Sequence, residues 1–418
     1  MVKIFFISIF LSLSLLNAKE LTLQECIDKT LKNHPDIKKL SLAVSKSEAF
    51  LDIAKADYMP QINLGAQYNP ISTFTIQQNG RFNTKREESR EFEATLNQKI
   101  YDFSKTSSTV DAYEKDLNIA DLSLMDAKAL LIYNVKSLYH AAVVGTKAIE
   151  VRTNDLTLKE ELYKQAKELV NQGLKTQADA SSIQSALYLA QENLAVSKAD
   201  LNKVLKTLSL YMKEEIDPQS VFENTLLNSH SDINKDLLLK NASEQNFALK
   251  SSLEEIEKND LLYNASKAQN YGSIDAVAAY SHQDNLNEYD TSLIGLTYKV
   301  PIYSGGRIDA QIQQSRIAKE MAKESYNAKR LLIQEEIEAL LIDLQRYEYT
   351  LRAKESLIES SNATKEIVEA RYKEGLSTYV EILDAASVNL YAKLGLIEAK
   401  FAINKIINRL EYLQGETK

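Results

Sequence analysis

Two carboxylates, Glu381 and Asp384, stand a few residues after Gly375 in the stretch YKEGLSTYVEILDAA. If this stretch is helical, a spacing of three places both acids on one face of the helix. Such a pair can attract cations, and several copies brought together would form a ring of negative charge. Acids near the start of a helix are also stabilised by the helix dipole alone. The spacing leaves both interpretations open.

Other candidate chemistry is sparse. The four histidines lie far apart in the chain, and Cys26 is the single cysteine. The stretch YSGGR, Tyr303 to Arg307, has too few glycines for a phosphate loop and is better interpreted as a strand-to-helix bend. We therefore predict no enzyme: no catalytic residues, no cofactor, no cofactor-binding residues and no metal site.

The elements that position the acids must be long. Only 11 Gly and 5 Pro interrupt 418 residues, and Ala, Leu, Lys, Glu and Ser fill the long stretches, which favours extended helices. The formal charge of −8 becomes −9 once Lys3 is removed with a leader segment. This acidic balance argues against a nucleic-acid partner.

The N-terminus resembles a secretory signal peptide. Lys3 precedes an apolar run from Ile4 to Leu16, and Leu16-Asn17-Ala18 is a small-residue cleavage site. We expect residues 1–18 to be removed, because the apolar run is too short for a spanning helix. Cys26 lies eight residues beyond that cut, so we expect a buried thiol rather than a lipid anchor.

The mature chain is an internal two-fold repeat, with a first unit at residues 19–217 and a second at 218–418. The stretch from Gly173 aligns without gaps on the stretch from Gly375, an offset of 202. Upstream, LNQKIYDFSK aligns on LTYKVPIYSG at an offset of 200.

Each unit predicts a helix, two strands and a long helical hairpin. Helices over Ser104 to Gln172 and Ile308 to Glu374 carry heptad patterns and would each be about 100 Å long. Alternating polar and apolar residues predict four strands per chain. The segments Ser72 to Glu88 and His282 to Asp290 are expected to be polar loops.

Two short strand pairs cannot lie open in lipid, because unpaired backbone groups would remain. Strands with one polar and one apolar face suit a closed transmembrane barrel, and with four strands per chain, three chains would give twelve strands. The alternative is a secreted periplasmic coiled-coil structural or adhesion protein without a pore.

The chain resembles the TolC-type outer-membrane efflux proteins along nearly its whole mature length. The resemblance is carried by four stretches, LTLQECIDKTLKNHPDIK, ADYMPQINLGAQYN, KVPIYSGGR and YKEGLSTYVEILDAASVNLYAKLGLIEAKFAINKIINRLEYLQG. It implies a mainly α-helical homotrimer with a twelve-stranded membrane β-barrel, continued by an antiparallel α-helical coiled-coil tunnel. Its location would be the outer membrane of a Gram-negative bacterium, in contact with lipid and extending into the periplasm.

The function that the resemblance implies is a passive duct of a tripartite export system. A periplasmic adaptor and an inner-membrane transporter of the RND, ABC or MFS type would open it, to export drugs and small molecules, or proteins in type I secretion.

The resemblance also implies roles for residues at the hairpin tips. Glu381 and Asp384 would form an acidic ring at the channel constriction. Asp179 and Tyr372 would help to close the periplasmic tip. The resemblance also implies an arginine in that closure, but this chain has Ser377 at the equivalent position. The adaptor would contact two Gly-Leu pairs, Gly173-Leu174 and Gly375-Leu376.

Overall fold

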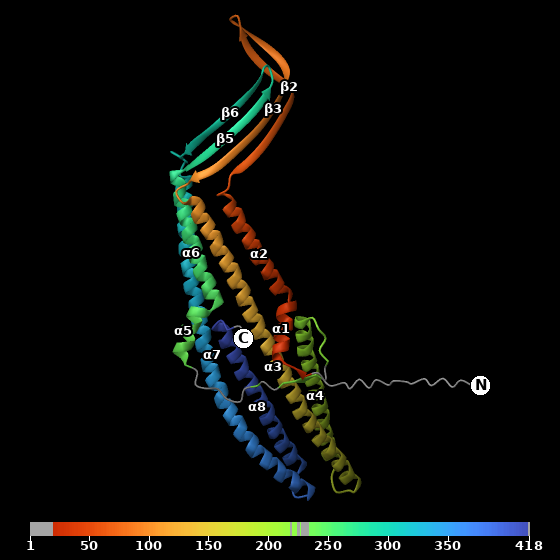
Figure 1. Cartoon of the computed structure of the whole chain (residues 1–418). Coiled ribbons are helices and arrows are strands. Elements are labelled where there is room, and N and C mark those ends of the chain that lie inside the picture. The colour runs from red at the N-terminus through yellow and green to blue at the C-terminus, as the bar shows by residue number, and fades with distance from the viewer. Residues whose placement is uncertain (1–19, 218–219, 224–225, 227–233, 417–418) are drawn as a thin grey trace, which may run out of the picture. The chain divides into compact units, whose positions relative to one another are not determined.

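The computed structural model describes residues 20–217, 220–223, 226 and 234–416 (Figure 1). The predicted signal peptide, residues 1–18, lies outside this part of the chain. The helices are α1 (Leu23–Asn33), α2 (Pro35–Ala56), α3 (Lys105–Asn171), α4 (Gln177–Met212), α5 (Lys235–Gln245), α6 (Phe247–Ala268), η1 (Gln269–Tyr271), α7 (Arg307–Lys373) and α8 (Tyr379–Leu413). The strands are β1 (Glu20–Leu21), β2 (Gln61–Gln78), β3 (Arg81–Tyr101), β4 (Val221–Phe222), β5 (Ser273–Asp284) and β6 (Glu288–Lys299).

The chain divides into two compact units. The helical unit draws its described residues from 1–37, 128–239 and 336–418, and the strand unit consists of residues 38–127 and 240–335. Each unit therefore contains segments from both halves of the sequence. The repeat boundary at residue 217 stays a prediction.

The strand unit contains one antiparallel sheet in the order β2-β3-β5-β6. One cross-strand row joins Ile62, Leu96, Ala278 and Ile294. Because side chains alternate along strands, this row and its neighbours give the sheet one apolar face. Ile294 on this face is 89% exposed and Leu296 is 75% exposed. The predicted four strands with two unlike faces are confirmed.

The expected polar loops are wrong. Ser72 to Glu88 is mostly strand, because β2 and β3 continue to a two-residue turn at Asn79 and Gly80, whose φ angles are +52° and +77°. Positive φ at both positions is what a type I′ hairpin turn requires. Figure 1 shows this ribbon running past the ends of β5 and β6, which are joined by a short connection from Asn285 to Asn287.

The two long helices agree with the prediction to within a residue at each end. Both α3 and α7 contain 67 residues, so each is about 100 Å long. Their starts at Lys105 and Arg307 and the turn glycines Gly173 and Gly375 all differ by 202. The offset of 200 that we expected for the strands before these helices stays a prediction.

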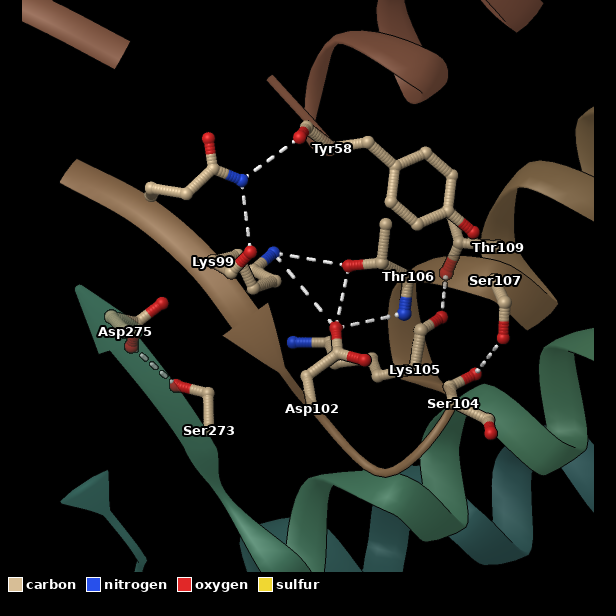
Figure 2. Close-up of polar contacts among 11 residues, drawn as sticks. Tyr58, Lys99, Asp102, Ser104, Lys105, Thr106, Ser107, Thr109, Ser273 and Asp275 are labelled. Carbon is tan, nitrogen blue, oxygen red and sulfur yellow. Dashed lines mark hydrogen bonds and ion pairs between the residues drawn. The ribbon is translucent and has the colours of Figure 1, made fainter. Parts of the chain in front are cut away.

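This joint uses different residues in the two halves. The Asp102 carboxylate accepts a hydrogen bond from the Thr106 backbone N–H at 2.9 Å, and Lys99 Nζ donates to Thr106 Oγ1 at 3.1 Å (Figure 2). In the second half, Ser304 Oγ accepts from the Ile308 backbone N–H at 3.4 Å. Each acceptor satisfies a free donor at the start of its helix.

In the core of the helical unit, α1 packs against α3 and α4. Cys26 and Tyr139 are fully buried there, with Val135, Leu208 and Met212. The Tyr139 hydroxyl donates to the Leu21 carbonyl at 2.7 Å and so ties the start of the described chain to α3. Burial raises the pKa of the Cys26 thiol to about 12.

Candidate functional site at the hairpin tips

The helical unit contains two helical hairpins, α3–α4 and α7–α8, whose turns are built alike. Gly173 and Gly375 both have a φ of +75°, a conformation that costs glycine little. The next residue in each turn donates back to the preceding helix, Leu174 N to Leu169 O at 2.9 Å and Leu376 N to Arg371 O at 2.7 Å. These are the bonds of a Schellman motif, so the predicted turn role of both glycines is confirmed.

A capping box restarts the chain as a helix after each turn. Thr378 Oγ1 accepts from the Glu381 backbone N–H at 3.3 Å, and the Glu381 carboxylate accepts from the Thr378 N–H at 2.9 Å. Thr176 and Asp179 make the same exchange at the start of α4. Glu381 is therefore bound to the start of its own helix.

The electrostatics of Glu381 follow from this position. Hydrogen bonds from the Thr378 backbone and then from the Ser377 side chain lower the pKa of the Glu381 carboxyl, and nearby Arg371 adds to this. Ser377 itself is buried. Ser377, where the family resemblance implies an arginine, thus donates a hydrogen bond to Glu381.

Asp384 differs from Glu381. Both are exposed on the first turns of α8, but within the described part of the chain no hydrogen bond or ion pair involves the Asp384 carboxylate. The two acids line one groove between α7 and α8. The prediction that they share a face is confirmed, whereas their role as a ring at a constriction stays a prediction.

Tyr372 lies in a buried cluster that both hairpins share. It is 5% exposed and packs with Leu162 and Ala166 of α3, Ala180 and Ile183 of α4, and Ile382 of α8. Burial, and then the charge of Asp179, raises the pKa of its phenol. The structure thus brings Tyr372 and Asp179 near each other where the hairpins meet, and within the described part of the chain no hydrogen bond joins their side chains.

The remaining predicted tip residues are exposed. Leu174 is 66% exposed and Leu376 is 69% exposed, so each turn presents an apolar side chain to solvent. Sequence reasoning missed Arg371, whose guanidinium donates to the Leu376 carbonyl at 3.4 Å. It also missed the capping pair of Thr378 and Glu381, which the Thr-x-x-Glu spacing could have indicated.

The fold and the tips define a class of protein. The chain is mainly helical with two β-hairpins. Asp179 and Glu381 cap the helices that follow the two turns, and Glu381 and Asp384 line a groove at the second tip. Among the described residues, no cluster of three or more His, Cys, Asp or Glu side chains could hold a metal ion. In the same residues, none of the helices has an apolar stretch long enough to span a bilayer.

The chain belongs to the outer membrane efflux protein family, whose model matches residues 26–212 and 238–416. It is an outer membrane efflux channel of the TolC type and not an enzyme. The two matched segments correspond to the two halves of the repeat. The family match excludes the alternative of a coiled-coil structural or adhesion protein without a pore.

Known proteins of similar sequence and fold support this family assignment. The chain is 24% identical over 407 residues to outer membrane protein TolC of Escherichia coli strain K12, covering 90% of this chain and 78% of that protein. A crystal structure of CusC has a TM-score of 0.82 at 17% identity, covering 94% of this chain and 91% of that chain. The CmeC outer membrane channel of Campylobacter jejuni has a TM-score of 0.82 at 17% identity, covering 94% and 85% of the two chains.

Proposed function

We propose that three copies of this chain close a twelve-stranded β-barrel in the outer membrane and continue it into the periplasm as a helical tunnel. The observation that carries this proposal is the sheet, which ends in two edge strands, β2 and β6, and exposes an apolar face. An open sheet cannot lie in lipid, because its edge donors and acceptors would stay unsatisfied. Pairing β6 of one copy with β2 of the next removes every edge.

In this proposal the barrel, and not a covalently attached lipid, anchors the protein in the outer membrane. Cys26 is the single cysteine of the sequence and is fully buried within α1. An acylated cysteine would have to leave that core.

The duct is passive, because the tip offers charge and apolar contact but no reacting group. A periplasmic adaptor would contact the exposed Leu174 and Leu376 beside their turn glycines. An energised inner-membrane transporter would supply the driving force, and drugs or other small molecules would be the cargo. At rest, the cluster around Tyr372 would keep the two hairpins of each copy together.

The acids of the second hairpin would form the narrowest part of the duct. Each chain would contribute Glu381 and Asp384, so a trimer would bring six carboxylates together. The first hairpin has Asp179 and Ser182 at the equivalent positions, at the common offset of 202. Most of the charge of the ring would then come from the second hairpin.

Planar-bilayer recording of the purified full-length protein tests this. We expect a trimer by native mass spectrometry and cation-selective channels. Glu381→Gln combined with Asp384→Asn should strongly reduce cation selectivity and weaken block by divalent cations. The matched control is Asp179→Asn, which should change selectivity less. A monomer without conductance would refute the barrel, and unchanged selectivity in the double variant would refute the ring.

A further inference from the structure

A pocket of about 560 Å³ lies in the helical unit between α3, α4 and β4. Its apolar lining residues are Val143, Ile149, Leu201, Val221 and Phe222. The volume is within the range of about 300–1,000 Å³ that small-molecule sites have. All of these residues belong to one chain and one compact unit, so the pocket does not depend on the proposed barrel.

The wall that β4 gives to the pocket is held in place by the core. Phe222 pairs with Leu21 of β1, and its ring meets the edge of the Tyr139 ring at 5.5 Å between centroids. The Tyr139 hydroxyl donates to the carbonyl oxygen of the next residue, Glu223, at 3.3 Å. These contacts fix the wall, so a ligand would not have to order it on binding.

Positive charge gathers at this pocket. Lys147 of α3 and Lys198 of α4 line it, and within the described part of the chain neither Asp nor Glu is among its lining residues. Burial, and then the charge of Lys400 in α8, lowers the pKa of the Lys147 ammonium, and Glu150 offsets this only in part. A bound anion would favour the charged form of Lys147. The pocket is thus locally basic in a chain whose formal charge is −8.

The second hairpin does not repeat these features. At the common offset of 202, Thr146 and Lys147 of the pocket correspond to Glu348 and Tyr349. The equivalent place in α7 therefore carries an acid and an aromatic ring instead of a small hydroxyl and a lysine. The combination of room and positive charge belongs to the first hairpin.

We infer that this pocket binds an amphiphilic organic anion, a carboxylate or sulfonate attached to an apolar chain or ring. The acid group would lie near Lys147 and Lys198, and the apolar part would cover Leu201 and Phe222. Burial of apolar surface would supply affinity, and the two lysines would select the sign of the charge. Lysines alone would not suffice, because an exposed ion pair contributes little.

The test measures binding to the full-length protein in lipid nanodiscs by equilibrium dialysis, with empty nanodiscs as the blank. The probe is naphthalene-2-sulfonate, and we expect one site per chain. Two competitors each keep half of its chemistry: methanesulfonate has the charge without the ring, and 2-naphthylmethylammonium has the ring with the opposite charge. Each should displace the probe only at a concentration about tenfold or more above that of competing unlabelled naphthalene-2-sulfonate.

Val221→Asp places a negative charge in the pocket and should weaken binding of the probe about tenfold or more. Val196→Asp is the matched control, because Val196 is 52% exposed on α4 outside the pocket and Val221 is 53% exposed. The control should bind the probe as the wild type does. The probe should also raise the thermal midpoint of the wild type and of the control, but not that of Val221→Asp.

Lys198→Gln gives a second route to the same answer. Lys198 is exposed on α4, so its replacement should leave folding intact even if Val221→Asp does not fold. Binding of the probe should weaken about threefold or more, because one of the two positive charges at the pocket is lost.

The inference is overturned if the wild type does not bind the probe, which would indicate that a neighbouring copy covers the pocket. It is also overturned if Val221→Asp and Lys198→Gln both bind as the wild type does. Displacement by methanesulfonate at the same concentration as by the unlabelled probe would reduce the site to a contact for simple anions. None of these results bears on the proposed duct, which is tested by trimer formation and conductance.

Discussion

Thr378 and Glu381 bind each other through two hydrogen bonds at the start of α8, so an acid proposed for the channel lumen also begins the helix that carries it. Thr378→Ala should destabilise this helix start by about 1 kcal/mol. Hydrogen exchange of the peptide that covers the tip should then become faster.

The charge and the cap of Glu381 can be separated. Glu381→Gln keeps an acceptor for the Thr378 N–H and should exchange nearly as slowly as the wild type, whereas Glu381→Ala should not. Hydrogen bonding lowers the pKa of Glu381 in the folded protein below its ordinary value of 4.5. The ionised carboxylate therefore stabilises the helix start fully above pH 4.5, and this stabilisation is lost as the pH falls through the lower pKa of the folded protein. Equal exchange in both variants would contradict this account.

Tyr372 should hold the two hairpins together mainly by packing. Tyr372→Ala removes a buried aromatic ring and should destabilise the tip by about 3–5 kcal/mol. In single-channel recordings of the resting channel, we expect a higher conductance. Tyr372→Phe keeps the ring and should behave nearly as the wild type. If the phenylalanine variant opens as widely as the alanine variant, the hydroxyl beside Asp179 is the closing element instead.

His140 should make the helical unit sensitive to acid. It is 4% exposed, Nδ1 lies 3.2 Å from Asn408 Nδ2, and burial, helped by the charge of Lys136, lowers its pKa to about 4. An unfolded chain binds this proton near pH 6.5, so stability should fall as the pH drops from about 6.5 to about 4. The full effect is on the order of 3 kcal/mol.

His140→Gln tests this, because the amide oxygen can still accept from Asn408. The thermal midpoint, followed by circular dichroism, should depend less on pH between 4 and 6.5 in this variant. Above pH 7 the two proteins should show equally flat profiles. A variant that keeps the full slope in the acid range would assign that slope to other groups.

Cys26 should be inert in the folded protein. Burial raises the pKa of its thiol to about 12, so little thiolate exists at neutral pH and reagents cannot reach the sulfur. Maleimide should label it only after denaturation. Leu174→Cys in a Cys26→Ala background is the control, because this tip position is 66% exposed and should react at once. Rapid labelling of native Cys26 would mean that α1 opens.

The sequence was sufficient for the long elements. The scarcity of Gly and Pro, and the heptads between Ser104 and Gln172, predicted α3 closely, since an uninterrupted apolar stripe leaves few alternatives. The polar segment Ser72 to Glu88 was misjudged because it forms a two-stranded ribbon that is exposed on both faces. Such a ribbon needs no apolar alternation, and only the Asn-Gly turn indicates it.

The site was predictable in part. The glycine turns and the shared face of Glu381 and Asp384 follow from local spacing. The cluster around Tyr372 does not, because it joins segments about 200 residues apart in the sequence.

The equal lengths of α3 and α7 restrict how this protein can change in evolution. Their tips meet in one cluster, so a deletion in one helix would pull its turn out of reach of the other. A shorter channel would need matched deletions in both helices, in whole heptads that preserve the packing seam. Related channels that differ in reach should therefore differ by paired, equal changes in the two halves of their sequences.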